Sequence, residues 1–166
     1  MEFLGFLLVN TICTMLAAII IYYFLKINFK VEGNLLILVL SFGLINGIGS
    51  SLWTNLFKLS HNLDVLKSVL LVIISILIIK FSLKTNWLKA ILGFVVVVIL
   101  GTGVVGNIFT SIILSSKTVD DALSDLPTYI QANLIVHAFT ILFVVIVQII
   151  KLLITNLNKS TSVSKN

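Results

Sequence analysis

Five apolar stretches, each long enough to cross a lipid bilayer as a helix, constrain this chain more than any other feature. Such a crossing takes about 20 mostly apolar residues. The five stretches are Phe3 to Leu25, Asn34 to Phe57, Val65 to Leu83, Ala90 to Ser116 and Ile130 to Ile150. Only 10% of the 166 residues are charged, against about 25% in soluble domains. The sequence therefore predicts an all-α, polytopic integral membrane helical bundle of about five transmembrane helices.

The chain offers no sign of a second domain. It has one proline and no Gly/Ser-rich linker, and only its last dozen residues are polar. We therefore expect a single transmembrane helical domain over residues 1–154, followed by a short polar cytoplasmic tail over residues 155–166. The lipid bilayer is its first expected partner, and a multi-pass protein of the cell membrane is the expected setting.

The lysines predict the orientation of this bundle. Loops on the cytoplasmic side of a membrane carry an excess of positive charge. With five spans, one side receives eight of the 11 lysines and the other side three, Lys58, Lys67 and Lys117. The N-terminus is therefore predicted outside and the C-terminus inside. The chain has no arginine to supply the bidentate fork that reads guanine and phosphate, so no nucleic-acid partner is expected.

Two helix starts carry recognisable capping residues. Thr85 or Asn86 suits the N-cap of the fourth span, because side-chain oxygens there accept from free backbone N–H groups. Thr128 and Gln131 form a capping box directly after Pro127, which predicts the start of the fifth span.

Small residues predict where helices approach closely. Gly43 and Gly47 form a GxxxG pair in the second span, and Ser50 extends the same face. We expect packing within the chain, with a homodimer seam as the alternative. In the fourth span, Gly103 and Gly106 belong to a run of three glycines in six residues. Close packing is expected there, and a hinge is the alternative.

Several uncharged polar residues lie inside the spans. Asn46, Asn107 and His137 are each candidates for ligand contact. Their default role is to orient helices, because hydrogen bonds between membrane helices are worth about 0.6 kcal/mol on average.

The loop before the fifth span predicts a second kind of site. Asp120 and Asp121 lie in a segment, residues 116–127, whose apolar residues recur at helical spacing. Trp53 and Tyr129 fall near the same outer interface. Together they predict an outer mouth with an acidic rim, suited to a cationic or amphipathic peptide. A solvated linker is the alternative.

The sequence lacks the groups that most enzymes and metal sites need. It has one cysteine, Cys13, two distant histidines and no acidic residue in the middle of a span. A metal site needs clustered ligands, and no catalytic or phosphate-binding motif is present. We therefore expect no enzyme activity, no metal and no cofactor.

Four short motifs carry a family resemblance. They are Leu44-Ile45-Asn46-Gly47 followed by Ser50-Ser51-Leu52, Ile78-Ile79-Lys80-Phe81, Asn86-Trp87-Leu88-Lys89-Ala90-Ile91-Leu92-Gly93-Phe94, and Leu126-Pro127-Thr128-Tyr129-Ile130-Gln131-Ala132-Asn133-Leu134-Ile135. Over residues 34–150 the chain resembles the membrane sensor domain of AgrC-like histidine kinases, the peptide-pheromone receptors with a GHKL kinase module. The sequence carries neither a phospho-acceptor histidine in a cytoplasmic helix nor an ATP-binding box, so the resemblance implies sensing without the kinase module.

These observations favour a membrane sensor or receptor. It would perceive an extracellular signal, such as a peptide or another small ligand, and relay it through its last helix to a cytoplasmic partner or missing kinase module. The alternative is a small transporter or immunity subunit, or a membrane-embedded accessory protein of a transporter. A membrane enzyme ranks last.

Overall fold

The computed structural model describes residues 2–25, 33–49, 51–53, 61–114 and 126–163. All regular secondary structure in these ranges is helical. Five stretches are long and apolar enough to cross a membrane: Phe3–Leu25, Gly33–Trp53, Val65–Ser82, Trp87–Ile113 and Leu126–Asn156. The predicted all-α bundle with five membrane helices is therefore confirmed.

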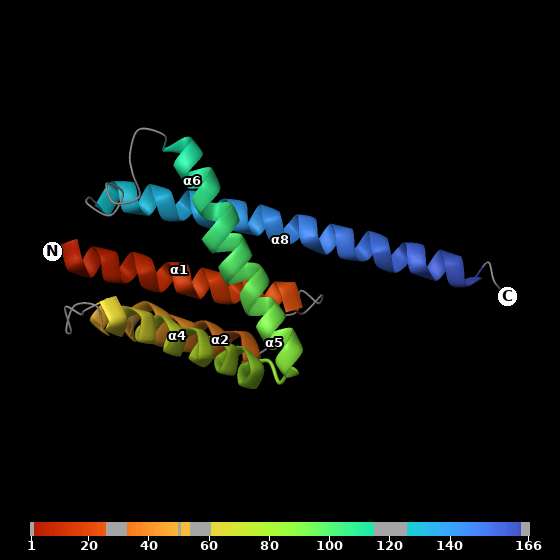
Figure 1. The fold of residues 1–166 in the computed structure, drawn as a ribbon, viewed down its shortest axis with the longest axis horizontal. Helices are drawn as coiled ribbons and strands as arrows, with labels where there is room; N and C mark the ends of the chain where they lie inside the picture. Colours follow the sequence, from red (N-terminus) through yellow and green to blue (C-terminus); the bar gives the residue numbers. More distant parts are fainter. Residues whose placement is uncertain (1, 26–32, 50, 54–60, 115–125, 164–166) are drawn as a thin grey trace.

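Successive spans run in opposite directions (Figure 1). The elements are α1 (Glu2–Leu25), α2 (Gly33–Phe42), the π-helix η1 (Gly43–Gly49), α4 (His61–Ser82), α5 (Trp87–Phe94), the π-helix η2 (Val95–Gly106), α6 (Asn107–Ile113) and α8 (Leu126–Val163). The fourth span, made of α5, η2 and α6, crosses the others obliquely, and α8 continues well past the end of the bundle (Figure 1).

The bundle is closed at one end by an apolar cluster. Tyr22 of α1, Leu38 of α2, Ile79 of α4 and Val97 of η2 are all fully buried there. These residues lie where α1 and α4 finish and where α2 and the fourth span begin, which is the predicted cytoplasmic end. Beyond this cluster the fourth span packs on α8 through η2 and α6, whereas the contact of α4 with the fourth span is mainly at α5, beside the cluster. The helices therefore diverge towards the predicted outer end.

The glycines of the second span lie against α1 of the same chain. A Cβ atom at Gly47 would lie 2.6 Å from the Cα atom of Thr11, and one at Gly43 would clash with the side chain of Met15. Across the same seam, Asn10 Nδ2 donates to Ser51 Oγ at 2.9 Å. The close approach predicted for this face is thus made within the chain. The predicted Ser50 lies outside the described residues.

The glycines of the fourth span have different neighbours. A Cβ atom at Gly106 would lie 2.7 Å from Val136 Cγ1, and one at Gly101 would lie 2.7 Å from Thr140 Cγ2, so both glycines pack on α8. Gly103 does not: it is exposed, and a Cβ atom there would meet only the carbonyl oxygen of Val98 in its own helix. The helical register turns Gly103 away from α8, which corrects the expectation that it packs.

One predicted cap is confirmed and one is wrong. Asn86 is the N-cap of α5, and its Oδ1 accepts from the Lys89 backbone N–H at 2.9 Å. The predicted capping box at Thr128 is wrong, because α8 already begins at Leu126. Pro127 can occupy this first turn, since its fixed φ suits a helix and its missing N–H would have no helical partner there.

The lysine distribution gives a first testable prediction, on topology. In a Cys13→Ala background, Lys67→Cys should react with a membrane-impermeant thiol reagent added to intact cells, and Lys84→Cys should react only after permeabilisation. Lys67 lies near the start of α4, whereas Lys84 lies in the turn beyond its end. Labelling of position 84 alone on intact cells would contradict the predicted outside location of the N-terminus.

Candidate functional site

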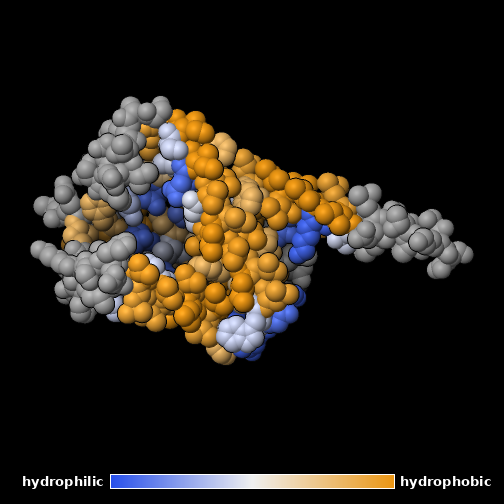
Figure 2. Space-filling view, in the orientation of Figure 1, coloured by the Kyte–Doolittle hydropathy of each residue, from blue (hydrophilic) through white to orange (hydrophobic). Residues whose placement is uncertain are grey.

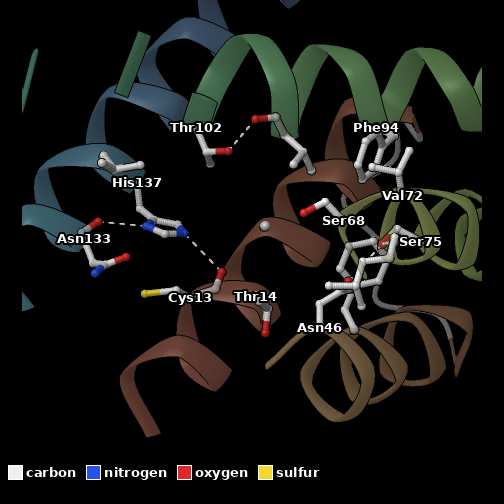
Figure 3. A pocket seen from close by; sticks show the side chains of 15 residues that line it. Cys13, Thr14, Asn46, Ser68, Val72, Ser75, Phe94, Thr102, Asn133 and His137 are labelled. Carbon is white, nitrogen blue, oxygen red and sulfur yellow. Dashed lines mark hydrogen bonds between the residues drawn. The ribbon is translucent and has the colours of Figure 1, made fainter. Parts of the chain in front are cut away.

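A cavity of about 390 Å³ lies inside the bundle, and all five spans line it. Ligand pockets in proteins occupy about 300–1,000 Å³. Its lining includes seven polar side chains: Thr14, Asn46, Ser68, Ser75, Thr102, Asn133 and His137. Figure 3 shows these groups facing a common space from α1, η1, α4, η2 and α8. A cavity of this size and polarity within membrane spans is the candidate ligand site.

The divergence of the helices creates this cavity. Residues of α1 form one wall, while α4 and η2 form the two flanks. Figure 2 shows a hollow with hydrophilic residues inside it, next to a hydrophobic surface. The cavity is therefore open on a flank of the bundle, between α4 and η2.

His137 connects α8 to α1 at the edge of the cavity. Its Nδ1 lies 2.8 Å from the Asn133 carbonyl oxygen, and its Nε2 lies 3.1 Å from the Cys13 carbonyl oxygen. In a neutral imidazole one ring nitrogen donates and the other accepts, so each tautomer makes only one of these two hydrogen bonds. One tautomer ties α8 to α1. The other leaves Nε2 as an acceptor for a donor group in the cavity.

Asn46 and Ser75 form the second polar pair of the cavity. Ser75 Oγ lies 3.1 Å from Asn46 Oδ1 and 2.6 Å from the Leu71 carbonyl oxygen, and its single hydroxyl proton serves one of the two. Asn46 Nδ2 is buried and has no hydrogen-bond partner among the residues that the structure describes. An unsatisfied buried polar group costs about 1–3 kcal/mol, so rotation of this amide towards a bound polar group would recover free energy.

The hydroxyl groups add hydrogen-bond acceptors. Thr102 Oγ1 donates to the Val98 carbonyl oxygen at 2.5 Å, and Thr14 Oγ1 donates to the Thr11 carbonyl oxygen at 2.9 Å. Because Thr102 uses its hydroxyl proton within its own helix, its oxygen lone pairs remain available. Thr14 Oγ1 instead lies against Gly47 of η1.

The described residues that line the cavity include no carboxylate, ammonium or guanidinium group. None of its 15 residues is Asp, Glu, Lys or Arg, and the described part of the chain holds no group of three or more His, Cys, Asp or Glu side chains that could bind a metal ion. The arrangement can therefore offer hydrogen bonds and apolar contact to a ligand.

Two π-helices border the cavity. Asn46 belongs to η1, and Val98 and Thr102 belong to η2. Helices of this kind are rare and occur frequently at functional sites. Here the π-helical turns determine the directions in which the side chains of Asn46 and Thr102 point from the second and fourth spans.

The structure brings two of the predicted ligand-contact residues together, Asn46 and His137, because both line the cavity. It does not add Asn107, which is exposed and whose Nδ2 donates to the Gly103 carbonyl oxygen at 2.8 Å within its own helix. That bond gives the amide a partner in its own helix, and ligand contact at Asn107 stays a prediction.

The predicted outer mouth is not assembled among the described residues. Trp53 lines a separate pocket of about 290 Å³, together with Lys67. Tyr129 packs edge-on against Phe6, with ring centroids 5.0 Å apart. Asp120 and Asp121 lie outside the described residues.

Sequence reasoning missed five polar residues of the cavity: Thr14, Ser68, Ser75, Thr102 and Asn133. One signal was available, because Asn133 and His137 are four residues apart and so share a helix face. The hydroxyl groups gave no such signal, since serine and threonine are common in membrane helices as packing residues.

The unpartnered amide of Asn46 gives the second prediction. Asn46→Leu should raise the free energy of unfolding by about 1 kcal/mol, because it removes a buried unsatisfied group, while Ser75 keeps its bond to the Leu71 carbonyl. Asn133→Leu is the matched control and should not stabilise, since Asn133 Nδ2 already donates to the Tyr129 carbonyl at 2.9 Å. Thermal unfolding in detergent measures both, and a destabilised Asn46→Leu would show that the amide is satisfied.

Comparison with known proteins found no matching family model, no matching curated protein and no matching solved structure. The fold and the cavity therefore carry the functional argument by themselves. They define a multi-pass membrane protein with a mostly apolar internal cavity into which a few polar side chains are set.

Proposed function

We propose that the chain is a sensor domain of the cell membrane, which binds a signal molecule in the cavity and transmits its occupancy through α8. The observation that carries this proposal is the double role of α8. Its first half lines the cavity through Asn133 and His137, and its second half runs on to Val163. At 1.5 Å per residue, its 38 residues span about 57 Å, compared with about 30 Å for the hydrocarbon core.

The contact between His137 and α1 supplies a means of coupling. A ligand that donates a hydrogen bond to His137 Nε2 would take the place of the bond to the Cys13 carbonyl oxygen. That exchange removes one tie between α8 and α1. The Gln148 side chain, which donates to the Phe24 carbonyl oxygen at 2.6 Å, provides a second tie nearer the cytoplasmic end. Loss of the hydrogen bond from His137 to the Cys13 carbonyl oxygen would thus let α8 pivot about the hydrogen bond from Gln148 to the Phe24 carbonyl oxygen.

The closed end of the bundle favours sensing over transport. The apolar cluster around Tyr22, Leu38 and Ile79 fills the predicted cytoplasmic end. The cavity is therefore closed at this end and does not continue through the bundle as a channel would. The resemblance to AgrC-like sensor domains supports the same proposal. Under it the chain acts without catalysis and passes its signal to a cytoplasmic partner or a kinase module.

Native mass spectrometry can test whether the cavity holds a ligand. The chain is extracted into nanodiscs directly from its own membrane and released in the spectrometer. Wild-type protein should carry a bound molecule, and Thr102→Phe should lose it, because a benzyl group at a lining position occupies part of the 390 Å³.

The matched control is Ser111→Phe, which places the same group on the exposed surface of α6. It should retain the bound molecule. If Thr102→Phe melts like the wild type and still carries the same bound mass, the cavity is not the binding site and the proposal fails.

A further inference from the structure

The cavity also indicates what kind of molecule it takes and by which route. We propose that the ligand is an uncharged amphiphile that enters sideways from the lipid, between α4 and η2, and places its polar group against Asn46, Ser75 and His137. This inference rests on the proposed function, since it assumes that the cavity is a binding site. It adds the class of the ligand and the direction of its approach.

The lining of the cavity selects against charged ligands. Among the described residues, no Asp, Glu, Lys or Arg side chain lines it. An ion without a partner is costly to bury away from water, and the lining offers hydrogen bonds but no carboxylate or ammonium counter-ion. The cavity therefore disfavours carboxylates, phosphates and amines, and accepts hydroxyl or amide groups, which need only hydrogen bonds.

Two polar groups of the cavity are deeply buried, since Ser75 and His137 are 2% and 8% exposed. Ser68, a third polar lining residue, is exposed on α4. Val72 on α4 is 38% exposed, and Val98 lines the cavity from η2. A ligand with its polar group beside Ser75 and His137 and its apolar part beside Val72 and Val98 matches this arrangement.

The opening lies at the depth of the lipid chains. Val72 is near the middle of the Val65–Ser82 span, and Val98 is near the middle of the Trp87–Ile113 span. The gap between Val72 and Val98 therefore lies at mid-span, and Ser68 extends the lining towards the start of α4. A molecule already dissolved in the bilayer reaches this opening without crossing water, whereas a polar solute must first enter the hydrocarbon.

The cavity offers both acceptors and a donor to the polar group of a ligand. The oxygen of Thr102 and the accepting tautomer of His137 are the acceptors, and the Asn46 amide, which has no partner among the described residues, is a donor after a side-chain rotation. A head group with both a hydrogen-bond donor and an acceptor can pair with the acceptors and with the donor of the cavity at the same time. A hydroxyl-bearing ester or an amide meets this requirement.

Photoaffinity labelling tests the inference with three competitors that share one chain. The purified protein in nanodiscs is labelled with a monoacylglycerol that carries a diazirine in its acyl chain. Unlabelled 1-monooleoylglycerol, oleate and oleylamine then compete at equal concentration. The neutral compound should compete at least about tenfold better than either charged one, which corresponds to about 1.4 kcal/mol. Labelled peptides should come from α4 and η2.

Two matched variants test the route. Val98→Phe narrows the opening and should reduce labelling at least about fivefold. Val104→Phe makes the same change on the same π-helix at a position that is 45% exposed and outside the cavity lining, so it should label like the wild type. Thermal unfolding of both variants establishes that they are folded.

Two results would overturn the inference. Competition by oleate or oleylamine as strong as that by 1-monooleoylglycerol would show that charge does not matter. Labelling spread over the lipid-facing surface and unchanged in Val98→Phe would show that the opening is not the route. In either case a bound mass that Thr102→Phe removes would leave the proposed function standing, so the two failures are distinguishable.

Discussion

Gly47→Leu is expected to force the second span away from α1 and to lower the stability of the bundle severely. A Cβ atom at this position would lie 2.6 Å from Thr11 Cα and 2.9 Å from Thr14 Oγ1, so the clash is with backbone as well as side chain. Backbone cannot rotate away, and the two spans must separate. Overpacking of well-packed interiors costs about 1–3 kcal/mol, and this site should reach or exceed the upper value. Thermal unfolding and size-exclusion chromatography in detergent measure the effect.

Gly33→Leu is the control for this substitution. It introduces the same side chain into the same span at the first residue of α2, where no atom of the described residues lies within 4 Å of the added Cβ. Its melting temperature should stay close to that of the wild type. If Gly47→Leu also melted and eluted like the wild type, the α1–η1 seam would not be closely packed.

Gly106→Leu should have the second largest effect, at the seam between η2 and α8. Its Cβ atom would lie 2.7 Å from Val136 Cγ1 and 3.1 Å from Val136 Cα. The added side chain therefore pushes against α8 directly beside His137. We expect a loss of about 1–3 kcal/mol, together with loss of whatever the cavity binds, because Val136 and His137 both line it. Thermal unfolding and native mass spectrometry of the same sample report the two effects.

Gly103→Leu is the internal comparison, three residues away in the same π-helix. Gly103 is exposed, and no atom of another described helix would touch a Cβ added there, so the same substitution should cost well under half as much stability. Equal losses from Gly103→Leu and Gly106→Leu would point to the helix backbone and not to the seam with α8.

The sequence predicted the spans closely because their length and apolar character depend on local composition. The predicted second span began at Asn34, and the observed one begins at Gly33. The neighbours of Gly103 and Gly106 could not be predicted in this way. Which glycine faces α8 depends on the turn of η2, and the π-helical hydrogen bonding of Val95–Gly106 changes the register that an α-helix would give.

The site was predictable only in part. Asn46 and His137 stood out because amides and imidazoles are costly to bury in lipid without a partner. Asn107 has the same chemistry, yet it satisfies its amide on the Gly103 carbonyl of its own helix. Sequence reasoning cannot separate these outcomes, because they depend on which side of each helix faces the gap between α4 and η2.

Movement of α8 when the cavity is filled is tested most directly by a distance measurement between two spin labels. The labels are placed at Lys84→Cys, in the turn after α4, and at Lys151→Cys on α8, in a Cys13→Ala background. Double electron–electron resonance then compares the unmodified cavity with Thr102→Phe, which fills it, and with Ser111→Phe, which does not. We predict a shift of about 1–2 Å or more in the mean distance for Thr102→Phe alone, the size of helix shifts in known switches. Identical distance distributions in all three folded proteins would contradict the coupling of the cavity to α8.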